Sequence, residues 1–252
     1  MGYFDLTGKA AIITGGGRGL GYAMSEALCE AGAKVAIIGS SESGIEAAKE
    51  LSDKGYTAFG VKGDLSSREY TPEFFEEAVD LLGGRIDILV NNAGIQRRNK
   101  CEDFLLNDWE EVLNVNLTAV FQLCQLAGRK MIDQGGGKII NIASMLSYFG
   151  GFTVPAYAAS KGGVSQLTKA LSNEWASKGI NVNAIAPGYM VTEMNEALIN
   201  DPNRNKEILS RIPAGRWGTP EDMKGIIVFL ASSASNYLNG ALIPVDGGYL
   251  GR

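Results

Sequence analysis

The sequence TGGGRGLG at residues 14–21 follows a short apolar run and opens a segment of helical period. In such a turn Gly15 permits the tight bend, Gly19 lets the backbone approach a pyrophosphate, and Gly21 lets the helix pack closely on the strand. The N-terminus of the helix adds N–H donors and the positive end of its dipole. A glycine-rich turn alone is also an ordinary strand-to-helix connection, but its place in the first β–α–β unit favours a dinucleotide site.

The alternation of this first unit continues along the whole chain, because short β-branched runs alternate with longer segments of helical period. We predict strands at residues 10–14, 35–38, 57–62, 86–90, 138–142, 180–186 and 242–245, and helices at 19–31, 43–54, 71–82, 108–132 and 155–177. The strands are apolar throughout rather than alternating, as a parallel sheet covered on both faces requires. The sequence therefore predicts an α/β protein: a single-domain Rossmann fold over residues 1–252, with a seven-stranded parallel doubly wound sheet and helices on both faces.

Composition excludes several classes of protein. The chain has 23 Lys+Arg and 28 Asp+Glu, and its net charge of −5 argues against a nucleic-acid partner. It contains no histidine, which excludes Ser-His-Asp and Cys-His catalysis and any His-containing zinc site, and we expect no metal. Its three cysteines form no C-x-x-C pair, which fits a reducing compartment. The chain has neither a signal-peptide pattern nor an apolar run of about 18 residues, so we expect a cytoplasmic protein with no membrane partner.

Ser144, Tyr157 and Lys161 are the candidate catalytic residues. Tyr157 and Lys161 are four residues apart on a predicted helix and therefore share one face. An ammonium beside a phenol favours the phenolate, so we expect the pKa of Tyr157 to be lowered toward the working pH. Ser144 lies at the end of the fifth strand, where ligands of such sheets bind, and its hydroxyl suits a substrate carbonyl. A Tyr-x-x-x-Lys pair alone is usually helix surface, but the serine and the nucleotide turn favour catalysis.

Arginines indicate an anionic substrate. Arg97 and Arg98 follow the end of the fourth strand, near the ligand crevice, and Arg216 lies in the segment 189–219. This segment interrupts the strand–helix alternation and is a candidate lid, with a plain surface excursion as the alternative reading. A guanidinium matches a carboxylate bidentately, so we predict that one of these arginines holds a substrate carboxylate. Solvated surface arginines are the alternative.

Taken together, these motifs resemble the short-chain dehydrogenase/reductase family along the whole chain. The positions that match are the glycine motif at 14–21, Asp64 for the acid of the adenine pocket, Asn91–Gly94, Asn116, Ser144, Tyr157 with Lys161, and Pro187-Gly188 with Thr192 at the nicotinamide site. The resemblance implies that Tyr157 is the general acid/base, and that Lys161 lowers its pKa and binds the nicotinamide ribose. It also implies that Ser144 orients the substrate oxygen, and that Asn116 holds a water that relays protons from Lys161.

Two sets of contacts follow. For the cofactor we expect Gly15, Gly17, Arg18, Gly19, Leu20, Gly21, Ser40, Ser41, Asp64, Leu65, Asn91, Ala93, Gly94, Tyr157, Lys161, Pro187, Gly188, Val191 and Thr192. For the substrate we expect Gln96, Arg97, Arg98, Ser144, Met145, Tyr157, Arg216 and Trp217.

The choice of dinucleotide stays open between NADP(H) and NAD(H). In Rossmann sites an acid after the second strand takes the ribose 2′-OH of NAD and repels a 2′-phosphate. Here Ser40 and Ser41 stand at that place, with no carboxylate until Glu42, and Arg18 suits a 2′-phosphate. This arrangement resembles NADP-using β-ketoacyl reductases of the family and slightly favours NADP(H), whereas the subgroup described next is generally NAD-linked.

Within the family, residues 94–98, 139–147, 185–189, 211–218 and 245–252 resemble the 2-dehydro-3-deoxy-D-gluconate 5-dehydrogenases of pectin and alginate breakdown. Gluconate 5-dehydrogenases share part of these patterns, and so do reductases of the alginate-derived unsaturated uronate 4-deoxy-L-erythro-5-hexoseulose uronate. The resemblance implies an anionic keto-sugar substrate and a homotetramer, whose interface residues 226–231 and 242–245 could equally be core. A non-catalytic dinucleotide-binding regulator is the alternative from another class. It would be favoured by loss of Tyr157, Lys161 or Ser144, all of which are present.

Overall fold

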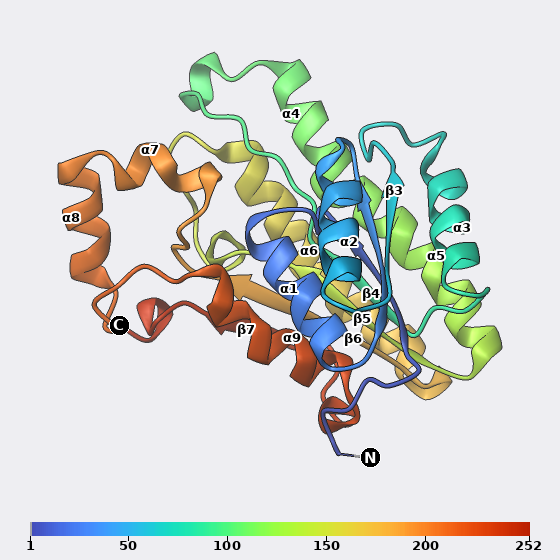
Figure 1. The fold of residues 1–252 in the computed structure, drawn as a ribbon. Helices are drawn as coiled ribbons and strands as arrows, with labels where there is room; N and C mark the ends of the chain where they lie inside the picture. Colours follow the sequence, from blue (N-terminus) through green and yellow to red (C-terminus); the bar gives the residue numbers. More distant parts are fainter. Residues whose placement is uncertain (1) are drawn as a thin grey trace.

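The computed structural model describes residues 2–252, so that only the first residue of the predicted domain lies outside it. Seven parallel strands form one sheet in the order β3-β2-β1-β4-β5-β6-β7 (Figure 1). The strands are β1 (Ala10–Thr14), β2 (Lys34–Gly39), β3 (Ala58–Lys62), β4 (Ile88–Asn91), β5 (Gly137–Ile142), β6 (Ile180–Pro187) and β7 (Leu242–Val245). The order reverses between β1 and β4, and ligands of doubly wound sheets bind at the carboxyl ends of the strands beside such a reversal. The predicted fold class is confirmed.

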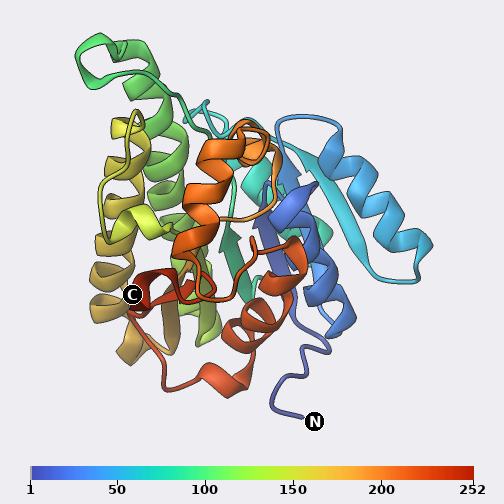
Figure 2. The same cartoon turned by 90° about the vertical axis from the view of Figure 1, so that its left-hand side faces the viewer.

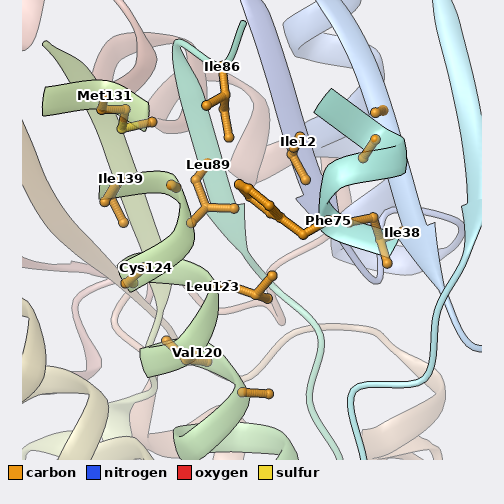
Figure 3. Packing of buried hydrophobic residues seen from close by; sticks show 14 of the residues in the cluster. Ile12, Ile38, Phe75, Ile86, Leu89, Val120, Leu123, Cys124, Met131 and Ile139 are labelled. Carbon is orange, nitrogen blue, oxygen red and sulfur yellow. The ribbon is translucent and has the colours of Figure 1, made fainter. Parts of the chain in front are cut away.

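Helices cover both faces of the sheet. They are α1 (Gly19–Glu30), α2 (Ser43–Asp53), α3 (Thr71–Leu81), α4 (Leu106–Leu113), α5 (Ala119–Gln134), α6 (Pro155–Trp175), α7 (Glu196–Ile199), α8 (Pro202–Arg211) and α9 (Lys224–Ala231). One buried cluster joins alternate strand residues to α3, α5 and α6, and Figure 3 shows Phe75 of α3 in it beside Ile12 and Leu89. The other cluster joins the intervening strand residues to α1, α2 and α9. Because both faces are covered, the strands are apolar at nearly every position.

The segment predicted as one helix over residues 108–132 is longer and contains an irregular turn. It runs from α4 through a π-helical turn, Asn114–Thr118, into α5. A π-helical turn adds one residue to the helix and is frequent at functional sites. In this turn the Asn116 side chain is fully buried and bonds back to the loop after β4 rather than pointing to solvent.

Residues 189–219, which we call the cap segment, leave the sheet after β6 and carry α7 and α8. Asp201 begins α8 by accepting hydrogen bonds from the N–H groups of Asn203 and Arg204, and Pro202 occupies the first helical position. The segment is anchored by its own small apolar cluster, which includes Ile208, Trp217 and, from the C-terminal end of the chain, Tyr249. In Figure 2 its helices, coloured orange, stand in front of the carboxyl ends of the strands.

None of the helices formed by residues 2–252 is long and apolar enough to cross a membrane.

Candidate active site

A cleft of about 720 Å³ opens between the carboxyl ends of the strands and the cap segment. Its lining includes most of the predicted site residues, which come from the loops after β1, β2, β3, β4, β5 and β6 and from α6. Exceptions among the predicted positions are Asn91, Arg97, Asn116, Val191, Arg216 and Trp217. The fold therefore brings distant motifs to one place, as the sheet topology requires.

The glycine turn after β1 is shaped to hold a dinucleotide. Gly15 and Gly19 adopt the left-handed conformation, with φ of 63° and 53°. A Cβ added to Gly21 would lie 2.0 Å from the carbonyl oxygen of Gly15, so the helix can approach the turn only without a side chain there. No side chain caps α1, and its first turn carries no acidic residue. The first N–H groups of α1 therefore remain available to a pyrophosphate, and the turn fits the predicted cofactor.

The loop after β2 and the start of α2 offer hydroxyl groups to the cleft. Ser40, Ser41 and Ser43 line it, and the hydroxyl oxygens of Ser41 and Ser43 are 2.9 Å apart. The Glu42 carboxylate lies 2.7 Å from the Lys62 ammonium and forms an exposed ion pair with it. Asp64 and Leu65, from the loop after β3, also line the cleft.

Ser144, Tyr157 and Lys161 form one wall of the cleft, which we call the Ser-Tyr-Lys wall. Ser144 follows β5 and its side chain accepts a hydrogen bond from the Leu146 N–H. The Lys161 side chain reaches inward from α6, where its ammonium donates to the Ile142 carbonyl at 2.6 Å. Lys161 is only 4% exposed, and burial lowers the pKa of its ammonium to about 8. A charged group that the protein buries without a carboxylate partner is typical of a functional site.

The pKa of Tyr157 differs from the expected direction. Burial raises the pKa of the Tyr157 phenol above its ordinary value, although the Ser144 hydroxyl and the positive charge of Arg98 act in the opposite direction. The Lys161 ammonium lies 5.6 Å from the centroid of the Tyr157 ring and is bonded to the Ile142 carbonyl, so it does not overcome the desolvation of the phenol. Burial of Tyr157 therefore favours the neutral, protonated form of its phenol.

Asn116 lies behind the cleft and fixes the loop that lines it. Its Oδ1 accepts from the Ile95 N–H at 2.8 Å, and its Nδ2 donates to the Ile95 carbonyl at 2.9 Å and to the Ser160 hydroxyl at 3.2 Å. A Cβ added to Gly94 would lie 3.2 Å from Oδ1 of Asn116 and 3.7 Å from Nζ of Lys161. The side-chain amide of Asn116 is thus occupied by protein groups, and the structure makes it a positioning residue.

The expectation that Asn91 contacts the cofactor needs correction. Its side chain is 2% exposed and points into the core, where Nδ2 donates to Oδ1 of Asn141 at 2.8 Å. Side chains alternate along a strand, so the next residue, Asn92, lines the cleft instead. Asn92 in turn bonds to the carbonyl oxygens of Thr14 and Gly15 and supports the glycine turn.

Two of the three predicted substrate arginines do not line the cleft. Arg97 is bound to Glu111 at 2.9 Å, whereas Arg216 pairs with Asp222 at 2.7 Å outside the cleft. Successive residues of an extended loop point to opposite sides, which explains why Arg98 faces the cleft and Arg97 does not. Arg98 makes no ion pair within residues 2–252, and its charge acts on Tyr157.

Two further predicted residues of the cap segment lie outside the cleft. Trp217 is 8% exposed and packs in the apolar cluster that anchors the segment, where its indole N–H donates to Oδ1 of Asn205 at 2.9 Å. Val191 is exposed, whereas its neighbours Met190 and Thr192 line the cleft. The remaining substrate residues, Gln96 and Met145, do line it.

Several residues that line the cleft are not predicted from the sequence. They are Tyr189, Arg204, Glu207, Arg211 and Tyr249. The Arg211 guanidinium lies 4.5 Å from the centroid of the Tyr249 ring, and it has no carboxylate partner among residues 2–252. Tyr249 comes from the last residues of the chain, and no local pattern links that position to α8. Only the fold brings them together.

The nucleotide-type turn, the doubly wound sheet and the Ser-Tyr-Lys wall together define an NAD(P)-dependent oxidoreductase. Residues 9–203 match the model of the short chain dehydrogenase family, and the chain belongs to that family. It is 50% identical over 259 residues to 2-dehydro-3-deoxy-D-gluconate 5-dehydrogenase from Bacillus subtilis strain 168, with both chains covered completely. The expected resemblance is confirmed, and the non-catalytic alternative is set aside.

Solved structures agree with this assignment. A protein from Beutenbergia cavernae, crystallised with NADP at low occupancy, has a TM-score of 0.97 at 47% identity, with all of both chains covered. A gluconate 5-dehydrogenase from Burkholderia cenocepacia J2315, in complex with NADP and tartrate, has a TM-score of 0.95 at 41% identity. There, 99% of this chain and 98% of that chain are covered.

Proposed function

We propose that the protein interconverts a keto group and a secondary alcohol on a carboxylated sugar acid, with NADP(H) or NAD(H). The observation that carries this proposal is Arg98, which lines the cleft without a carboxylate partner in residues 2–252 and whose positive charge lowers the pKa of Tyr157. A keto acid whose carbonyl lies at Tyr157 would bring its carboxylate within reach of that charge.

The first substrate pair to test is 2-dehydro-3-deoxy-D-gluconate and the corresponding 2,5-diketo-3-deoxygluconate, of pectin or alginate breakdown. Identity to the Bacillus subtilis enzyme supports this pair. The gluconate and 5-ketogluconate pair is the alternative supported by the Burkholderia cenocepacia structure. The unsaturated uronate 4-deoxy-L-erythro-5-hexoseulose uronate remains a third candidate, since it too is a carboxylated carbonyl compound.

In the proposed reaction the Ser-Tyr-Lys wall supplies or accepts the proton, and the hydride comes from or goes to the cofactor. The chemistry that NADPH or NADH supplies when bound is a hydride, and the pyrophosphate would be held at the glycine turn. In the direction of ketone reduction, the Ser144 hydroxyl holds the carbonyl oxygen, and the Tyr157 hydroxyl gives it a proton. The phenolate left on Tyr157 is stabilised by the nearby charges of Lys161 and Arg98. In the direction of alcohol oxidation, the same phenolate takes the proton back.

Asn116 and the loop after β4 keep this geometry in place. Because Asn116 bonds to both backbone groups of Ile95, it sets the path of the loop that carries Gly94 and Arg98. The positions of Gly94 and Arg98 therefore depend on a buried polar contact that Asn116 makes from the π-helical turn.

For the dinucleotide we favour NADP(H). Three hydroxyl groups, from the loop after β2 and the first residue of α2, line the cleft where we expect the ribose 2′-substituent. Glu42, the nearest carboxylate in sequence, does not line the cleft and forms an ion pair with Lys62. Arg18 lines the same cleft and offers a guanidinium to a 2′-phosphate. The two structural neighbours crystallised with NADP support this preference.

We also propose that the cap segment is a substrate lid and that the protein is a homotetramer. The lid proposal is supported by the position of Met190, Leu198 and Ile208 along one side of the cleft. For the tetramer, Ile227 and Leu230 of α9 are core residues, whereas Ile226, Val228 and Phe229 remain partly exposed and are available to a subunit contact.

Steady-state kinetics test the proposed reaction. Reduction of 5-ketogluconate and 2,5-diketo-3-deoxygluconate is measured with NADPH and with NADH, beside D-fructose as a neutral ketose of similar size. We expect at least one acid to exceed the ketose in kcat/KM by about 10-fold or more, the value of one charge-assisted contact. Equal kcat/KM for fructose and both acids would refute a carboxylate-selective site.

A further inference from the structure

An ion pair crosses the mouth of the cleft between two distant parts of the chain. Nη1 of Arg18, in the glycine turn, lies 2.7 Å from Oε2 of Glu193, near the start of the cap segment. Both residues line the cleft, and their side chains are 74% and 72% exposed. An exposed pair of this kind is held weakly, so a stronger partner for Arg18 displaces Glu193 readily.

Arg18 lies beside the loop that receives the ribose 2′-substituent. A Cβ added to its neighbour Gly17 would lie 2.6 Å from the backbone of Ser43, so the glycine turn and the N-terminus of α2 are in direct contact. The hydroxyl groups of Ser41 and Ser43 lie 2.9 Å from each other, and both serines line the cleft together with Arg18. The Arg18 guanidinium, which suits a 2′-phosphate, is therefore already paired with the Glu193 carboxylate.

We propose that Glu193 is a specificity-determining residue for the cofactor, which competes with the 2′-phosphate of NADP(H) for Arg18. The proposal rests on the proposed contact between Arg18 and the 2′-phosphate. The 2′-phosphate of NADPH must displace the Glu193 carboxylate from Arg18 or bind beside it. Because the phosphate and the carboxylate are both negatively charged, they repel each other. NADH lacks the 2′-phosphate and so has no group that competes with Glu193 at this place, and the ion pair persists when NADH binds. Glu193 thus reduces the preference for NADPH over NADH that Arg18 and the serines create.

Isothermal titration calorimetry of the whole protein, without substrate, tests the proposal through the Kd values of NADPH and NADH. The variants are Glu193→Gln, Arg18→Ala and the double variant. Glu196→Gln is the matched control, because it removes the same charge from an exposed position of the cap segment that does not line the cleft. We expect Glu193→Gln to tighten NADPH by about threefold or more, which is within the range of an exposed ion pair, and to leave NADH nearly unchanged.

The outcomes separate this proposal from the one it rests on. In the Arg18→Ala background, Glu193→Gln should change the Kd of NADPH much less, because the contested group is gone. If Arg18→Ala leaves the ratio of the two Kd values unchanged, the proposed role of Arg18 fails as well. If Arg18→Ala weakens NADPH but Glu193→Gln leaves the ratio unchanged, or weakens both dinucleotides equally, the competition is refuted and the proposed function stands. If Glu196→Gln tightens NADPH as much as Glu193→Gln does, the effect comes from the net charge of the protein, and the competition for Arg18 is refuted.

Discussion

The Ser-Tyr-Lys wall and the charges at the mouth of the cleft are held in opposite ways. Lys161 is 4% exposed, donates to the Ile142 carbonyl and has no carboxylate within salt-bridge distance among residues 2–252. The charges at the mouth form what we call the charged rim, which consists of Arg18, Arg98, Glu193, Arg204, Glu207 and Arg211. The charged rim, by contrast, is exposed or half-exposed and includes two ion pairs, Arg18 with Glu193 and Arg204 with Glu207.

This difference indicates a division of labour. Burial of Lys161 disfavours its charge, and that arrangement persists because the surrounding core fixes α6 against β5. The rim pairs contribute little to stability because water screens them, and each can be exchanged for a ligand. We infer that the wall performs proton transfer from fixed positions, whereas the rim recognises the charges of cofactor and substrate.

The largest expected effect is that of Tyr157→Phe, which removes the proton donor and keeps the ring. We expect kcat for ketone reduction to fall by about 10²- to 10⁴-fold, the usual contribution of a positioned acid or base. The Kd of NADPH should stay within about threefold, since the pyrophosphate and adenosine contacts are untouched. A variant that retains most of its kcat would remove Tyr157 from the mechanism.

A smaller effect is expected at the rim, where Arg98→Ala removes the proposed carboxylate contact. KM for the keto acid should rise by about 10-fold, the value of one charge-assisted interaction. Arg216→Ala is the control, because Arg216 is paired with Asp222 outside the cleft and should leave KM unchanged. Arg97→Ala is less suitable, since it would release the Glu111 carboxylate, which lines the cleft. A rise for Arg216→Ala that equals the rise for Arg98→Ala would contradict the assignment.

The smallest effect concerns stability and its dependence on pH. In the folded state the Lys161 pKa is about 8, below its ordinary value of 10.5, so between these values the unfolded chain binds more protons. Lys161 therefore makes wild-type stability rise with pH in this interval. Lys161→Met removes the cost of burying the charge, and we expect its Tm to exceed that of the wild type by a few °C near pH 7.

The difference in Tm between Lys161→Met and the wild type should narrow toward about pH 9.5, as the wild-type ammonium loses its proton. Lys138, whose pKa burial also lowers to about 8, is present in both proteins and cancels from the difference. Thermal unfolding followed by circular dichroism at several pH values measures it. A difference that is negative, or that does not vary with pH, would show that burial of the charge has no such cost.

The sequence predicted the sheet because its signal is local. Each strand is a short apolar run that ends in a turn, and the glycine motif lies at one such end. Ser144, Tyr157 and Lys161 could be found for the same reason, since the spacing along α6 and the end of β5 determine where they lie.

For other residues, the sequence does not show whether the side chain points into the cleft or away from it. Asn91 and Asn92 are equivalent in the sequence, and only the register of β4 turns the first toward Asn141 in the core and the second into the cleft. Arg97 and Arg98 differ in the same way. The π-helical turn at Asn116 and the contact between Arg211 and Tyr249 depend on packing between distant segments, which no local pattern encodes.

A single-turnover experiment tests the division of labour most directly. Each protein, saturated with NADPH, is mixed with increasing keto acid, and the loss of NADPH absorbance gives a limiting rate and a half-saturating concentration. We expect Tyr157→Phe to lower the limiting rate by about 10²-fold or more with the half-saturating concentration nearly unchanged. Arg98→Ala should raise the half-saturating concentration by about 10-fold. Its limiting rate should fall far less than that of Tyr157→Phe, because Arg98 only helps to stabilise the phenolate and does not carry the proton. If the two variants exchange these patterns, or if each changes both quantities alike, the separation of a proton-transferring wall from a recognising rim is wrong.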